Sequence, residues 1–223
     1  MNDGADPHAD PHRGERVLFA GAPLNEAKAA MIMLHGRGAD AADILGLSST
    51  LDREDVAYLA PNAAGRAWYP RPFMTPTAGN EPYLSSALGV VAHLLGEIAL
   101  AGVPAERTVI LGFSQGACLA LTFAARSPRR YGGIVALSGG LIGEAIEPSA
   151  YTGSLAGTPV FLGCSDRDPH IPAARVHAST AIMRELGGAV SERIYPGMGH
   201  TVIADEVGQV QAILDAAIGV DAD

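Results

Sequence analysis

One short segment of the chain has the pattern of a serine nucleophile. Residues 112–116 (Gly-Phe-Ser-Gln-Gly) follow the apolar run 108–111 and lead into a stretch rich in alanine and leucine. A Gly-x-Ser-x-Gly segment between a strand and a helix places the serine on a sharp turn, with its hydroxyl pointing into a cleft. This context predicts that Ser114 attacks an acyl carbon. The alternative is a glycine turn around a buried serine.

A serine hydroxyl needs a base that removes its proton, and the base needs an acid that fixes its tautomer. His200 fits the role of the base, because it follows the last predicted strand in a loop that contains Gly197 and Gly199. The alternative is a histidine that bonds its own backbone near a helix start. His93 and His177 fall within helical patterns and compete poorly.

Two carboxylates follow the penultimate predicted strand and compete for the role of the acid. Asp168 precedes a proline, which holds it extended in a loop, whereas Asp166 is close enough to the strand end to cap a turn. This difference favours Asp168 over Asp166. His170 could be mistaken for the base, but its closeness in sequence to Asp168 does not bring it to Ser114, and we expect an exposed loop histidine.

An acyl-transfer site also needs two N–H donors for the oxyanion. The turn itself supplies the N–H of Gln115. The glycine-rich loop 35–40 follows an earlier strand, and the N–H of Arg37 is the candidate for the second donor. This loop lacks the glycine spacing of phosphate-binding motifs. The guanidinium of Arg37 could hold a substrate carboxylate or pair with Asp40, and we expect the ion pair.

The irregular loop 62–82 is the predicted wall of the substrate pocket. It contains several prolines and carries Trp68, Tyr69 and Phe73 outside any repeating stripe. Aromatic side chains in such a loop predict an apolar surface on the acyl or alcohol side of the cleft. The alternative is that they fasten the loop to the core.

Apolar runs that alternate with helical patterns predict the frame that holds these residues. The runs are 17–19, 30–34, 56–60, 108–111, 133–137, 159–163 and 191–195. Apolar residues at spacings of three and four within 84–98 and 203–218 predict the core faces of two helices. This order predicts an α/β fold with a mostly parallel sheet of about seven strands and helices on both faces. Ligands of such sheets bind beyond the carboxyl ends of the strands.

Composition limits the partners of the chain. A formal net charge of −9 without any Lys/Arg cluster argues against nucleic acid as a partner. No signal peptide and no run of about 18 apolar residues is found, so we expect no membrane insertion. Cys118 and Cys164 lie in apolar stretches, which predicts buried thiols and a cytoplasmic protein.

We expect two parts in the chain. Residues 1–15, with His8 and His12, lack apolar periodicity and should form a disordered or loosely docked tail. A metal site formed by these histidines is the less favoured alternative. Residues 16–223 contain no linker or repeat, and their length suits a single domain.

Several motifs, in this order, resemble the phospholipase/carboxylesterase family of α/β-hydrolases, which includes bacterial carboxylesterases and acyl-protein thioesterases. They are His-Gly-Arg-Gly at 35–38, Trp-Tyr-Pro at 68–70, Gly-Phe-Ser-Gln-Gly at 112–116, Asp-Pro at 168–169 and Gly-Met-Gly-His at 197–200. The resemblance implies the α/β-hydrolase fold. It also implies Ser114 as nucleophile, Asp168 as acid, His200 as base, and the N–H groups of Arg37 and Gln115 as the oxyanion hole.

Two positions depart from the acyl-protein thioesterases. Those enzymes usually carry an apolar residue where this chain has Arg37, and Asp where it has Pro70. The chain more closely resembles a bacterial branch with His-Gly-Arg-Gly, Asn-Glu-Pro at 80–82 and Leu-Ser-Gly-Gly-Leu-Ile-Gly at 137–143. The departures weaken the transfer of long-chain or protein-bound acyl specificity, while ester hydrolysis remains supported.

The sequence therefore predicts a serine carboxylesterase for small to medium acyl esters, which works through an acyl-enzyme and needs no metal or organic cofactor. The first alternative is a thioesterase or lysophospholipase for longer acyl chains, which would need a long apolar channel. The second is a non-catalytic binding protein on the same fold, which fits poorly with an intact triad. The expected partner is a small-molecule ester, and the sequence is compatible with a homodimer.

Overall fold

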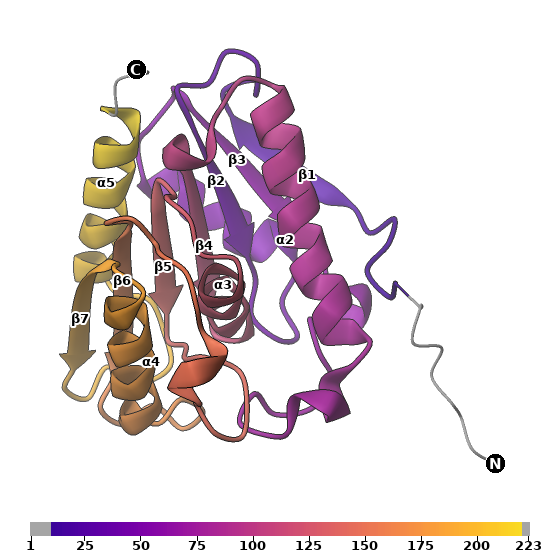
Figure 1. Cartoon of the computed structure of the whole chain (residues 1–223). Coiled ribbons are helices and arrows are strands. Elements are labelled where there is room, and N and C mark those ends of the chain that lie inside the picture. The colour runs from indigo at the N-terminus through magenta and orange to yellow at the C-terminus, as the bar shows by residue number, and fades with distance from the viewer. Residues whose placement is uncertain (1–9, 220–223) are drawn as a thin grey trace.

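Seven strands form one central sheet in the computed structural model, which describes residues 10–219 (Figure 1). The strands are β1 (Val17–Gly21), β2 (Ala29–Leu34), β3 (Val56–Pro61), β4 (Thr108–Phe113), β5 (Gly133–Leu137), β6 (Pro159–Ser165) and β7 (Ala189–Tyr195). Their spatial order is β1-β3-β2-β4-β5-β6-β7. Strand β1 is antiparallel to β3, and the other neighbours are parallel. All the predicted strands are confirmed, with shifts of at most two residues at an end.

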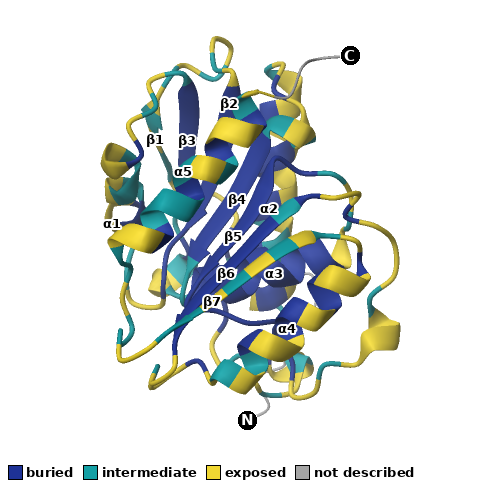
Figure 2. Cartoon of the chain, turned by 90° about the vertical axis from the view of Figure 1, so that its left-hand side faces the viewer, coloured by how far each residue is buried: buried dark blue, intermediate teal, exposed yellow. Residues whose placement is uncertain are grey.

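Helices cover both faces of the sheet, as predicted (Figure 2). One face carries α2 (Tyr83–Leu100), α3 (Gln115–Arg126) and α4 (Ala173–Glu185), and the other carries α1 (Ala41–Leu45) and α5 (Ala204–Ile218). Short 3-10 helices lie in the connections, at Gly46–Thr50, Ala64–Arg66, Thr77–Asn80, Ala105–Arg107 and Pro148–Ala150.

The central strands are apolar along their whole length because both of their faces are covered. Successive side chains of β2 pack into two different cores. Ile32 belongs to the core beneath α2 and α3, whereas its neighbours Met31 and Met33 belong to the core beneath α1 and α5. A central strand such as β2 therefore needs apolar residues at consecutive positions, because its alternate side chains enter two separate cores.

Helix α2 is the one helix within residues 10–219 that is long and apolar enough to cross a membrane, by length and composition alone; its mean hydropathy is 1.5. Leu84, Val91, Leu95 and Ile98 are buried in the core, and Leu88 packs half-buried against it. The predicted stripe is thus confirmed as the face that holds α2 to the sheet.

His12 is buried against the domain, so the expectation of a disordered or loosely docked tail is wrong at this residue. The side chain of His12 is buried, Nε2 lies 3.0 Å from the carbonyl oxygen of Trp68, and Nδ1 accepts the N–H of Ala64 at 3.0 Å. Burial lowers the pKa of His12, which keeps the ring neutral with one donor and one acceptor. His8 lies outside the described residues.

Cys118 and Cys164 are buried free thiols, as predicted. Burial raises the pKa of Cys118 to about 11 and that of Cys164 to about 12. Both thiols therefore stay protonated at neutral pH.

Candidate active site

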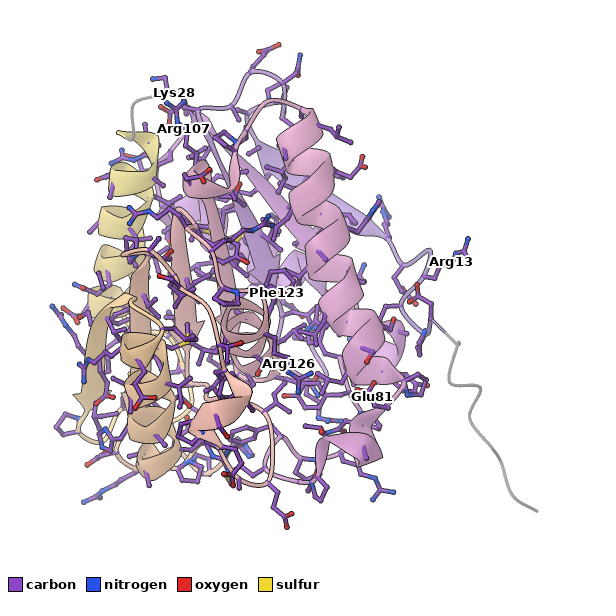
Figure 3. The ribbon with its side chains drawn as sticks, in the orientation of Figure 1. Arg13, Lys28, Glu81, Arg107, Phe123 and Arg126 are labelled. Carbon is purple, nitrogen blue, oxygen red and sulfur yellow. The ribbon has the colours of Figure 1, made fainter. Side chains whose placement is uncertain are left out.

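The predicted site residues lie at the carboxyl ends of the parallel strands. In Figure 3, Lys28 and Arg107 directly precede β2 and β4 and mark the opposite, amino end of the sheet, whereas Glu81, just before α2, lies towards the carboxyl end. Loops from several strands meet at this edge. It is the edge at which ligands bind in open α/β sheets.

Ser114 lies on the turn between β4 and α3, with φ 54° and ψ −115°. A non-glycine residue adopts this conformation only where the surroundings enforce it. The N–H of Ser114 donates to the carbonyl oxygen of Leu137 at 2.9 Å. A Cβ at Gly112 would come within 2.2 Å of the Gly116 carbonyl group, and one at Gly116 within 2.1 Å of the carbonyl oxygen of Leu34. Both glycines are therefore needed for α3 to pack this closely against the strands.

His200 and Asp168 meet Ser114 at this edge. Nε2 of His200 lies 2.9 Å from Oγ of Ser114, and Nδ1 lies 2.7 Å from Oδ2 of Asp168. The carboxylate accepts a hydrogen bond from the N–H at Nδ1. Nε2 is then unprotonated and can accept the proton of the serine hydroxyl. The three residues predicted from the sequence as nucleophile, base and acid thus form one hydrogen-bonded chain.

The side chain of Asp168 is buried, and both of its oxygens accept hydrogen bonds. Its Oδ1 accepts the N–H groups of His170 at 2.8 Å and Ile171 at 3.0 Å, in addition to the bond from His200 to Oδ2. Burial acts to raise the pKa of Asp168, but the hydrogen bonds from His200 and the two N–H groups outweigh it, so the pKa is lowered. The acid therefore stays charged at neutral pH.

Asp166 has a different task. It is exposed, and its Oδ1 accepts the N–H of Gly197 at 2.7 Å. Beside it, Oγ of Ser165 accepts the N–H of Gly199 at 3.1 Å. These two bonds tie the loop that carries His200 to the end of β6.

The N–H groups of Arg37 and Gln115 make no hydrogen bond within residues 10–219. Gln115 is the first residue of α3, where the N–H groups have no partner inside the helix. A Cβ at Gly36 would lie 3.4 Å from Cβ of Ser114, so the loop of Arg37 runs directly beside the serine. Both predicted donors thus flank Ser114 and suit an oxyanion there.

The side chain of Gln115 has a role that the sequence analysis missed. Its Oε1 accepts the N–H of Trp68 at 2.8 Å, and its Nε2 donates to the carbonyl oxygen of Tyr69 at 2.8 Å. This buried amide fastens the pocket loop to the start of α3. The only local signal is a polar residue at the start of a mostly apolar helix.

A cavity of about 580 Å³ opens above Ser114 and His200. Tyr69 and Phe73 line it, as predicted, and so do Phe113 and Ile171, which the sequence analysis did not identify. Its volume lies in the range typical of small-molecule sites.

Trp68 does not line this cavity, so its assignment as a pocket residue is wrong. Its side chain is completely buried, and Nε1 donates to the carbonyl oxygen of His35 at 2.9 Å. His35 itself is buried, with Nδ1 2.7 Å from the carbonyl oxygen of Gly36 and Nε2 accepting the N–H of Ala63 at 3.1 Å. These contacts join the pocket loop to the loop of Arg37.

The guanidinium of Arg37 does not pair with Asp40, so the expected ion pair is also wrong. Its Nη2 donates to the carbonyl oxygens of Tyr69 at 2.6 Å and Arg71 at 3.3 Å. Asp40 pairs with Arg66 at 3.1 Å instead.

Two further rings flank His200. The Phe113 ring centroid lies 4.9 Å from that of His200, and the ring of His170 meets it edge-on at 5.0 Å. His170 is exposed, as expected, and lines the cavity rather than bonding Ser114. Among the described residues, no group of three or more His, Cys, Asp or Glu side chains could hold a metal ion.

Comparisons with known proteins identify a family and several relatives. Residues 18–218 match the family model described as Phospholipase/Carboxylesterase. The chain is 26% identical to acyl-protein thioesterase 1 of Saccharomyces cerevisiae over 90% of this chain and 98% of that protein. It is 33% identical to acyl-protein thioesterase 1 of Gibberella zeae, over 51% of this chain and about half (49%) of that relative.

Solved structures agree with this match. The phospholipase/carboxylesterase from Dyadobacter fermentans is 44% identical, with a TM-score of 0.87 over 90% of this chain and 97% of that one. Esterase PE8 is 26% identical, with a TM-score of 0.73 over 89% of this chain and 96% of that one. The seven-stranded sheet is therefore that of the α/β-hydrolase fold.

Proposed function

Because the chain belongs to the phospholipase/carboxylesterase family, we propose that it is a serine hydrolase that cleaves carboxylic esters of small to medium acyl chain. One observation carries this proposal. The contacts of 2.9 Å from Ser114 to His200 and 2.7 Å from His200 to Asp168 have the order of atoms that activates a serine hydroxyl, and they lie beside a cavity of ligand size.

In the proposed reaction, Oγ of Ser114 attacks the ester carbonyl carbon while Nε2 of His200 takes the hydroxyl proton. The negative charge on the carbonyl oxygen is stabilised by the N–H groups of Arg37 and Gln115. His200 then returns the proton to the leaving alcohol, and the acyl group stays on Ser114. His200 next deprotonates a water molecule, whose oxygen attacks the acyl carbon. The bond from this carbon to Oγ of Ser114 breaks, the acid leaves, and His200 returns the proton to Oγ.

The size of the cavity supports small to medium esters, since about 580 Å³ holds a small molecule beside the nucleophile. The second candidate is a thioesterase or lysophospholipase. The similarity to two proteins named acyl-protein thioesterase 1 favours it. Attack by Ser114 follows the same course on a thioester, so the candidates differ in the leaving group and the length of the acyl chain.

The test combines turnover with covalent labelling. Purified protein is assayed with esters and thioesters that range from acetyl to palmitoyl, and a fluorophosphonate probe is mapped by peptide mass spectrometry. Fast turnover of the shorter esters together with labelling of Ser114 supports the proposal. Preference for long-chain thioesters would favour the second candidate. Absence of both turnover and labelling would reject a serine hydrolase.

A further inference from the structure

Arg37 and Arg71 are among the residues that line the cavity beside Ser114. No Asp or Glu side chain lines it, and neither arginine has a salt bridge within residues 10–219. The carboxylate of Asp40, which is close in sequence, is already paired with Arg66. The lining of this cavity thus contains two arginines and no carboxylate, in a chain whose formal net charge is −9.

Both arginine side chains contact the loop that lines the cavity or its continuation. Nη2 of Arg37 donates to the carbonyl oxygens of Tyr69 and Arg71, while its Nε and Nη1 make no hydrogen bond within the described part of the chain. The stem of Arg71 passes closely over Gly79, where a Cβ would lie 2.9 Å from Cδ and 3.2 Å from Nε of the arginine. Guanidinium groups with free donors and reduced freedom bind anions at a lower entropic cost.

We propose that Arg37 and Arg71 bind an anionic oxygen group of the substrate, which makes the preferred substrates esters that also carry a carboxylate or a phosphate. This inference rests on the ester hydrolysis proposed above. Guanidinium N–H groups match the oxygens of both anions and form charge-assisted hydrogen bonds with them. Because both arginines and Ser114 line the same cavity, one small ester can reach all three at once.

The bound anion would also orient the ester. The backbone N–H of Arg37 is one of the two proposed donors to the oxyanion, and its guanidinium donates to the carbonyl oxygens of Tyr69 and Arg71. In this proposal, one residue binds the anion through its guanidinium and the ester carbonyl oxygen through its backbone N–H. A guanidinium that only fastens the pocket loop would give no preference for charged esters, and this difference is measurable.

The test compares matched esters at neutral pH. They are the 4-nitrophenyl monoester of adipic acid, its methyl-capped neutral counterpart, and the 4-nitrophenyl ester of 5-phosphonopentanoic acid. We expect kcat/KM to favour a charged ester about tenfold, as one charge-assisted hydrogen bond provides. The preference should weaken at high salt, because the arginines are accessible to solvent. A larger ratio for the phosphonate would identify phosphate as the group, and a larger ratio for the adipate would identify carboxylate.

The readout in variants is the ratio of charged to neutral turnover, because the N–H of Arg37 is itself part of the proposed oxyanion hole. Arg37→Met should bring this ratio to about one, and Arg71→Met should lower it. Arg66→Met is the matched control, since Arg66 pairs with Asp40 and does not line the cavity; it should leave the ratio unchanged. An unchanged ratio in Arg37→Met, or a wild type that prefers the neutral ester, would overturn the inference.

A binding measurement separates this inference from the proposed function. Calorimetry with Ser114→Ala protein compares monoethyl adipate with diethyl adipate, and needs no turnover. Tighter binding of the monoethyl ester that is lost in Ser114→Ala/Arg37→Met supports the anion site even if no ester is hydrolysed. Equal binding of the two compounds refutes the anion site even if neutral esters are hydrolysed well.

Discussion

Glu206 in the first turn of α5 should make the stability of the protein depend on pH. Its carboxyl group is completely buried; Oε2 accepts the N–H of Ile203 at 3.0 Å, and Oε1 has no hydrogen-bond partner within residues 10–219. Oε1 packs against Gly163, where a Cβ would be only 2.2 Å away. Burial raises the pKa of Glu206 to about 7; the bond from Ile203 opposes this shift, and the charge of Asp205 adds to it.

The sign of the effect follows from proton binding. Between the ordinary pKa of 4.5 and the raised value of about 7, the folded protein keeps a proton that the unfolded chain loses. The folded state is therefore favoured by this group at low pH, and stability falls as the pH rises through that window. At about 1.4 kcal/mol for each pH unit, Glu206 lowers the free energy of unfolding by about 3 kcal/mol above the window.

Glu206→Gln removes the titration and keeps a similar shape. We expect urea denaturation to show that wild type loses about 2 to 3 kcal/mol relative to this variant between about pH 5 and pH 8. Glu97→Gln, at an exposed position of α2, is the control and should follow wild type. Parallel pH profiles for wild type and Glu206→Gln would refute the argument that burial of this carboxyl group shapes the stability curve.

Three further changes test the site. Ser114→Ala should lower turnover of an activated ester by several orders of magnitude, measured by stopped assay, with an unchanged circular dichroism spectrum. Asp168→Asn should lower kcat by about 10³- to 10⁴-fold and Asp166→Asn far less, because only Asp168 bonds the imidazole; equal losses would identify the wrong acid. Trp68→Ala should lower stability by about 3–5 kcal/mol and reduce the turnover of all esters alike. A selective change in chain-length preference would instead return Trp68 to the pocket.

Structural features that depend only on neighbouring residues could be predicted from the sequence. The apolar runs predicted every strand, and the glycines around Ser114 predicted the turn, because each depends on residues that are adjacent in the chain. The choice between Asp168 and Asp166 was harder. Both follow β6, and only the position of His200, 32 residues further on, shows which of them reaches the imidazole.

Contacts between distant segments without apolar periodicity were not predictable. The docking of His12 depends on a carbonyl oxygen of Trp68, 56 residues away, and no pattern in the sequence marks it. The partners of the Arg37 guanidinium are backbone oxygens of the pocket loop, which any residue type could supply. The single domain, the cytoplasmic location and the homodimer stay predictions.

The two bonds that tie the His200 loop to β6 have a mechanical consequence. Ser165 and Asp166 hold the loop of the base, and Asp168 is two residues beyond Asp166, so base and acid are anchored to the same strand end. Ser114 is anchored elsewhere, at the junction of β4 and α3. A displacement of the β6–β7 edge would therefore move His200 and Asp168 together. The distance between His200 and Asp168 would change little. The distance from Nε2 of His200 to Oγ of Ser114 would change instead, and with it the activation of the serine.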